Sequence, residues 1–123
     1  MTERERSELE RTIQGFLRQK EKFEARAWLE GGGKKSVRFI GEMPPEQSVE
    51  FVEELYRLGA KEVLAVKIDR NMPYESINTM IVALPSDPNA RRKIFSFEGK
   101  RTGSEGFDPY EDYGQSHLHV WFD

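Results

Sequence analysis

The chain contains no cysteine among its 123 residues. A disulfide-stapled scaffold, a thiolate zinc cluster and a cysteine nucleophile are therefore excluded. No apolar stretch approaches the ~20 residues that a membrane-spanning helix needs. The first residues carry charges of both signs, which is not typical of a signal peptide. We therefore expect a cytoplasmic protein that has no membrane partner.

The glycine-rich motifs of common enzyme classes are missing as well. The sequence has no Walker P-loop, no Gly-x-Gly-x-x-Gly and no Gly-x-Ser-x-Gly. Neither sign of charge predominates, since 19 basic and 22 acidic residues give a net charge of −3. The basic runs at 91–93 and 100–101 are expected to face the glutamates of residues 46–54. No segment has the aromatic strand of an RNA-recognition motif, so nucleic acid is not an expected partner.

What the sequence does contain begins with an amphipathic helix, predicted over residues 3–29. A capping box at residues 2–5 marks its start, and a glycine triplet marks its end. The chain thus divides into a helix (1–30), a glycine-rich linker (31–35) and an α/β domain (36–123). The apolar stripe of the helix recurs every three or four residues. It comprises Leu9, Ile13, Phe16, Leu17, Phe23, Ala27 and Trp28.

The α/β domain has the element order βαββαβ and belongs to the α+β class. The spacing of apolar residues predicts four strands, at 36–40, 62–68, 77–84 and 117–123. Helical spacing predicts two helices between them, which begin at Pro45 and at Pro88. This order resembles the ferredoxin-like fold, which implies a four-stranded sheet with two helices on one face. Residues 77–84 are apolar on both faces, as an interior strand should be. The predicted core includes Leu55, Val66, Val82, Ile94 and Val120.

The C-terminal segment carries a second resemblance. The stretch from Asp112 through Gln115 to Val120–Asp123 is similar to the ends of small uncharacterised bacterial proteins. No activity follows from this resemblance, and the ferredoxin-like fold hosts many functions, so neither assigns a role to any residue.

The two faces of the predicted sheet differ in polarity. Strand alternation predicts that Val37, Phe39, Leu64, Val66, Ile68, Leu118, Val120 and Phe122 face the two helices. The other face then carries Arg38, Ile40, Ala65, Lys67, His117, His119, Trp121 and Asp123. This second face is too apolar for a bare surface, so we expect the N-terminal helix to cover it, on its own chain or on a partner.

Two histidines on the last strand are the strongest candidates for chemistry. His117 and His119 point to one face, with Asp123 further along it. Such a pair can present two nitrogens to a metal ion or act in acid–base catalysis. The alternative interpretation is two histidines at a partly covered sheet edge, which needs no ligand. A third metal ligand is not specified by any spacing.

The loop over Gly103–Gln115 is long for a small domain and rich in aromatic residues. Phe107, Tyr110 and Tyr113 are candidate partner contacts, together with Ile13, Phe16, Phe23 and Trp28 of the helical stripe. The alternative is that the loop packs its own aromatic residues over the sheet edge.

Two functions from different classes follow. The first is a non-enzymatic protein-interaction or regulatory module that self-associates, as a homodimer, and needs no cofactor. The second is a small metal-dependent hydrolase or phosphodiesterase that uses His117 and His119 with a divalent metal. Because no complete catalytic set is visible, the sequence favours the first, and the question whether the chain is an enzyme stays open.

Overall fold

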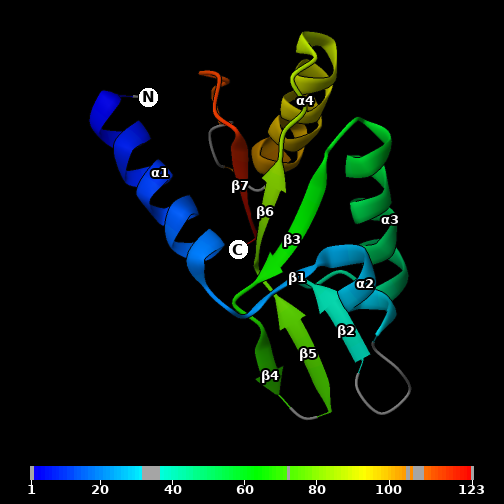
Figure 1. The fold of residues 1–123 in the computed structure, drawn as a ribbon. Helices are drawn as coiled ribbons and strands as arrows, with labels where there is room; N and C mark the ends of the chain where they lie inside the picture. Colours follow the sequence, from blue (N-terminus) through cyan, green and yellow to red (C-terminus); the bar gives the residue numbers. More distant parts are fainter. Residues whose placement is uncertain (1, 32–36, 72, 105, 107–109, 123) are drawn as a thin grey trace.

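The structure is a computed structural model that describes residues 2–31, 37–71, 73–104, 106 and 110–122. Within these residues the chain forms an α+β fold (Figure 1). Its elements are α1 (Glu3–Arg18), β1 (Lys22–Glu24), α2 (Ala25–Glu30), β2 (Val37–Ile40), α3 (Pro45–Arg57), β3 (Glu62–Val66), β4 (Asp69–Asn71), β5 (Tyr74–Ile77), β6 (Thr79–Ala83), α4 (Pro88–Ser104) and β7 (His117–Trp121).

The main sheet is four-stranded and antiparallel, in the order β1-β3-β6-β7. Strand β6 lies between β3 and β7, and its first four residues are all buried. The prediction that this segment is an interior strand is therefore confirmed. A smaller sheet has the order β2-β5-β4, with β2 parallel to β5 and β4 antiparallel to it.

The sheet order differs from a simple βαββαβ arrangement, because β2 lies outside the four-stranded sheet. Strands β5 and β6 follow each other with only Asn78 between them, and β2 and β7 end beside this point. The amide of Gly41 donates to the carbonyl of Ile77, and the amide of Phe122 donates to that of Asn78, both at 2.8 Å. Gly41 has a φ of +58°, and a Cβ there would lie 3.2 Å from Phe122. Strands β2 and β7 thus meet end to end rather than side by side.

The N-terminal segment is not one helix, which corrects the prediction for residues 3–29. Helix α1 begins at the predicted cap, where the hydroxyl of Thr2 accepts a hydrogen bond from the Glu5 amide at 3.2 Å. It ends at Arg18, just before Lys20 interrupts the apolar stripe. The chain then pairs with β3 through β1 and continues as α2. The predicted linker begins with Gly31, and its residues 32–35 lie outside the described part of the chain.

Helix α2 belongs to the main core, together with α3 and α4. Its Ala25, Trp28 and Leu29 are buried there. Glu24 caps α2 by accepting hydrogen bonds from two backbone amides of its first turn, and it also accepts the hydroxyl hydrogen bond of Tyr56 from α3. Burial alone would raise the pKa of the Glu24 carboxyl, but these hydrogen bonds outweigh burial and lower it.

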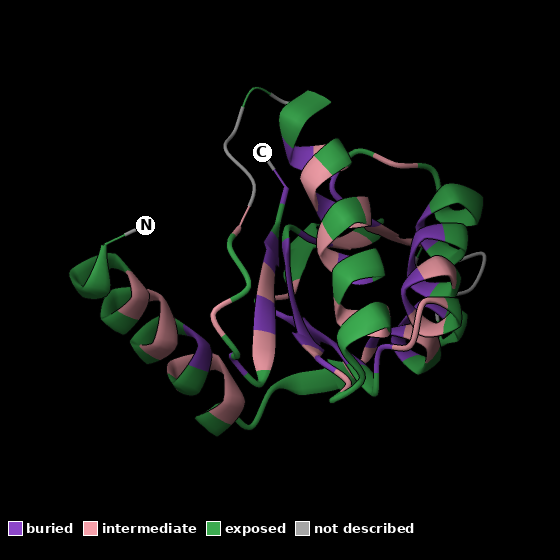
Figure 2. Cartoon of the chain, turned by 90° about the horizontal axis from the view of Figure 1, so that it is seen from above, coloured by how far each residue is buried: buried purple, intermediate pink, exposed green. Residues whose placement is uncertain are grey.

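The sheet is covered on both faces, by α1 on one side and by the other helices on the opposite side (Figure 2). The larger core contains four of the five predicted core residues, Leu55, Val82, Ile94 and Val120, all fully buried. The smaller core joins Ile13 of α1 to Leu64, Val66 and Ile81. The fifth predicted core residue, Val66, is therefore buried on the α1 side. The expectation that α1 covers the second face is borne out within its own chain.

Two strands present the opposite faces from those predicted. Leu64 and Val66 face α1, whereas Ala65 and Ile40 lie in the larger core. Lys67 has a φ of +53°, which interrupts the alternation after Val66. Ile68 therefore packs against the larger core even though it follows Val66 by two positions. The alternation of β7 is as predicted, with Leu118 and Val120 in the larger core.

The packing of α4 yields a first stability prediction. Ile94 is fully buried in the larger core, so Ile94→Ala leaves a cavity and should lower the free energy of unfolding by ~2–5 kcal/mol. Urea denaturation measures this loss. The exposed Ser96 on the same helix supplies the control, since Ser96→Ala should change stability by only about 0.5 kcal/mol. Equal effects of the two substitutions would show that this face of α4 is wrongly assigned.

Candidate functional site

Strand β7 presents its two histidines to the face that α1 covers. Because Leu118 and Val120 enter the larger core, His117, His119 and Trp121 alternate to the other side. Around this strand, α1 contributes Ile13, which is 1% exposed, with Leu9, Phe16 and Leu17 packed beside it. The candidate site is therefore a contact zone between α1 and the end of the chain.

The His119 side chain is held between two aromatic residues. Its ring stacks on Phe16 with centroids 6.1 Å apart and an interplanar angle of 11°. Its Nδ1 lies 3.2 Å from the hydroxyl of Tyr110. Burial lowers the pKa of His119, and the nearby charge of Lys67 lowers it further. Burial also raises the pKa of Tyr110, so at neutral pH a neutral imidazole can accept the phenolic hydrogen.

The His117 side chain has a more open and more acidic environment. Its Nδ1 lies 2.8 Å from the hydroxyl of Ser116. Burial lowers the pKa of His117, while the carboxylates of Glu10 and Glu62 oppose this shift. The two histidines therefore share a face but have different neighbours.

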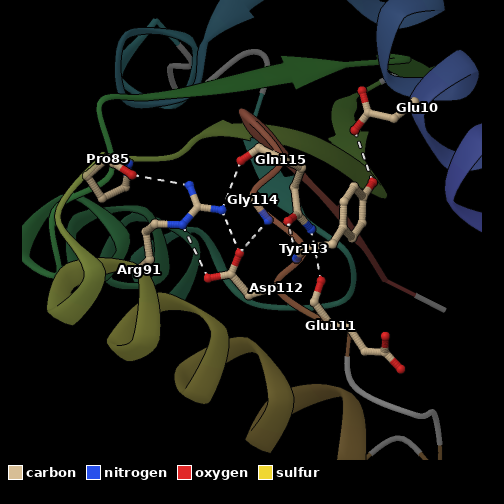
Figure 3. Close-up of polar contacts among 8 residues, drawn as sticks. All are labelled: Glu10, Pro85, Arg91, Glu111, Asp112, Tyr113, Gly114 and Gln115. Carbon is tan, nitrogen blue, oxygen red and sulfur yellow. Dashed lines mark hydrogen bonds and ion pairs between the residues drawn. The ribbon is translucent and has the colours of Figure 1, made fainter.

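Arg91 of α4 fixes the loop that precedes β7 (Figure 3). Its guanidinium donates to the carboxylate of Asp112 at 2.6 Å and to the carbonyls of Gln115 at 3.0 Å and Pro85 at 3.2 Å. The ion pair lowers the pKa of Asp112. Arg91 was expected to face the glutamates of residues 46–54, and this expectation is wrong because the loop supplies its partners.

Tyr113 connects this loop to α1. Its hydroxyl donates to Glu10 at 3.0 Å (Figure 3). The guanidinium of Arg6 lies 5.0 Å from the centre of its ring. Arg6 also pairs with Glu111 at 3.3 Å. Burial, followed by the hydrogen bond to Glu10, raises the pKa of Tyr113 to about 12, so the phenol stays protonated. The chain from Arg91 through the loop to Glu10 forms a clamp on α1.

A buried ion pair that was not predicted from the sequence holds the other end of β7. Glu98, only 1% exposed, pairs with Arg101 one turn later in α4. Arg101 in turn donates to the carbonyl of Trp121 at 2.7 Å and lies over the ring of Phe122. Helix α4 continues to Ser104 and so carries both residues of this pair. The spacing of a glutamate and an arginine three positions apart was the available signal.

The residues predicted as partner contacts have different environments. Phe16, Tyr110 and Tyr113 make contacts within the chain, as described above. Ile13 of α1 is buried against the sheet, and Trp28 is buried in the larger core. Phe23 on the edge strand β1 is 42% exposed. Phe107 and Asp123 lie outside the described residues.

A metal centre has limited support from the geometry. Among the described residues, no three histidine, aspartate or glutamate side chains converge as a ligand set. His117 and His119 supply two nitrogens from one strand, and Asp123, which shares their predicted face, lies outside the described residues. The described arrangement packs His119 against Phe16 of α1.

Comparisons with protein families, with curated proteins and with solved structures find no match to this chain. The resemblance of the C-terminal segment to small bacterial proteins therefore stays a prediction. In the part of the chain that the structure describes, no helix has the length and apolarity required to cross a bilayer.

The environment of His119 predicts how stability depends on pH. In the unfolded chain the histidine titrates near its usual pKa of about 6.5, whereas burial lowers the pKa in the folded chain. As pH falls through about 6.5, the unfolded state binds the proton first, so the free energy of unfolding should fall and then level off below the folded pKa. Urea denaturation across this range measures the change.

The substitution His119→Gln should flatten this part of the pH profile. His117→Gln is the matched control and should flatten it less, because His117 is less buried and faces opposing acidic charges. A profile that His119→Gln leaves unchanged would contradict the placement of this ring beneath α1.

Proposed function

We propose that the chain is a non-enzymatic protein-interaction module that self-associates. The observation that carries this proposal is the use of His119. The ring best suited to catalysis or metal binding stacks on Phe16 and bonds to Tyr110, so it serves the docking of α1. A catalytic or ligating imidazole needs a nitrogen directed at a substrate or metal, and the packing of this ring favours a structural role.

The other groups with shifted pKa values support the same proposal. Asp112 pairs with Arg91, Tyr113 bonds to Glu10, and Glu24 holds both α2 and α3. Each of these contacts fastens one segment of the chain to another. Shifted pKa values also accompany structural ion pairs and hydrogen bonds, so they do not by themselves indicate catalysis.

Exposed apolar side chains support the interaction role. Five large apolar residues are each more than a third exposed on the described surface, where another chain could cover them. They are Phe23, Val37, Val49, Tyr74 and Trp121. Their spread over several elements leaves room for contact with another protein chain.

The test has two parts, both on the full chain purified without an affinity tag. Sedimentation velocity at increasing protein concentration should show a reversible shift from monomer to dimer. Elemental analysis and zinc titration should show no stoichiometric metal, and His117→Ala and His119→Ala should leave the metal content unchanged.

Two results would contradict the proposal. A chain that stays monomeric at every concentration would remove the self-association. One equivalent of zinc or manganese that is lost in both histidine variants would instead support the metal-dependent hydrolase, in which His117 and His119 are the ligands.

A further inference from the structure

A groove with an aromatic floor runs between α3 and α4, on the side of the molecule away from α1. Its volume is about 830 Å³. Phe51 of α3 and Phe97 of α4 form the floor, with ring centroids 5.3 Å apart. Phe122 lies against Phe51 at the same spacing and lines an adjoining hollow, so the apolar floor is continuous.

The two rims of this groove carry opposite charge. On α3, Glu50 lines the groove and Glu46 lies one turn before it. On α4, Lys93 and Lys100 lie one turn before and one turn after Phe97, which places them on the same side of the helix as that ring. All four charged side chains are exposed. The groove therefore has an acidic rim on α3 and a basic rim on α4.

These charges differ from their neighbours in having no ion-pair partner within the described part of the chain. Glu53, Glu54 and Arg57 of α3 also line the groove, but Glu53 pairs with Arg26 and Glu54 pairs with Arg57. No such pair involves Glu46, Glu50, Lys93 or Lys100 among the described residues. The charges that flank the aromatic floor are thus available to a second molecule.

We propose that a second copy of this chain docks in this groove about a two-fold axis that runs along it. Such an axis places α3 of one copy over α4 of the other, so each acidic rim meets a basic rim. The aromatic floors then face each other, and Val49, which lines the groove and is 37% exposed, becomes covered. Two rims of like charge would repel in this arrangement, whereas opposite rims make the surface complementary to itself.

This assignment rests on the proposed function, because it names the surface through which the module self-associates. The rims also lie at matching heights. Phe51 and Phe97 are in ring contact across the groove, so the turns that carry Glu50 and the two lysines flank the same part of the floor. A groove that binds an unrelated helix does not need rims of opposite charge. Opposite rims make the groove complementary to itself, which favours a second copy as the occupant.

The experiment uses two charge-reversal variants of the full chain. One is E46K/E50K, and the other is K93E/K100E. The control is R11E/K20E, which changes two exposed cations near the opposite face and alters the net charge as much as K93E/K100E does. Circular dichroism establishes that each variant is folded, and sedimentation velocity measures the dimer dissociation constant.

Each rim variant alone should weaken the dimer about ten-fold or more, because like charges then meet at both rims. The control should dimerise as the unaltered chain does. A mixture of the two rim variants should recover dimers, since the reversed α3 rim of one chain, now basic, then faces the reversed α4 rim of the other, now acidic. Higher salt should weaken the unaltered dimer.

Several outcomes would overturn the assignment. If the unaltered chain forms dimers and the rim variants dimerise equally well, self-association stands but uses another surface. If the mixture fails to recover dimers, the rims do not face each other. If the unaltered chain is monomeric throughout, both the surface and the proposed self-association are wrong. NMR shifts on dilution of the unaltered chain locate the interface without any substitution, and they must involve Val49, Phe51 and Phe97.

Discussion

Strand β6 has no polar face, and this constraint determines much of the structure. Met80 and Val82 point into the larger core, while Ile81 points into the smaller one. Full burial of each such side chain contributes about 1.5–3 kcal/mol, so both faces must be kept from water. The α2, α3 and α4 helices cover one face, and α1 covers the other. The long N-terminal helix is therefore part of the domain rather than an appendage.

The polar contacts around α1 follow from this need. The apolar contact of α1 is small, because Ile13 is the one fully buried residue that the described part of the helix contributes. Arg91 pairs with Asp112 in the loop, and Tyr113 of the same loop donates a hydrogen bond to Glu10 of α1. Phe16 of α1 stacks on His119. Each of these contacts joins one segment of the chain to another. We propose the groove between α3 and α4 as the surface that meets a second copy of the chain.

The sequence predicted those features that depend on neighbouring residues. The capping box marked the start of α1, and the apolar run at residues 77–84 marked an interior strand. It did not predict β1, because the pairing of Phe23 with Ala65 joins segments far apart in the chain. The faces of β3 were also missed, since β3 turns Leu64 and Val66 toward α1 and the positive φ of Lys67 then interrupts the alternation. At the candidate site, the shared face of the two histidines was predictable, whereas the roles of Arg91 and Phe16 arise only from tertiary packing.

Helix α1 covers the sheet of its own chain. Methyl-to-methyl nuclear Overhauser effects from Ile13 to Leu64, Val66 and Ile81 test it most directly. In a sample that mixes labelled and unlabelled chains, isotope filtering separates contacts within one chain from contacts between two chains. These effects should appear within a single chain at every protein concentration. Their absence, or their appearance only between chains, would contradict it.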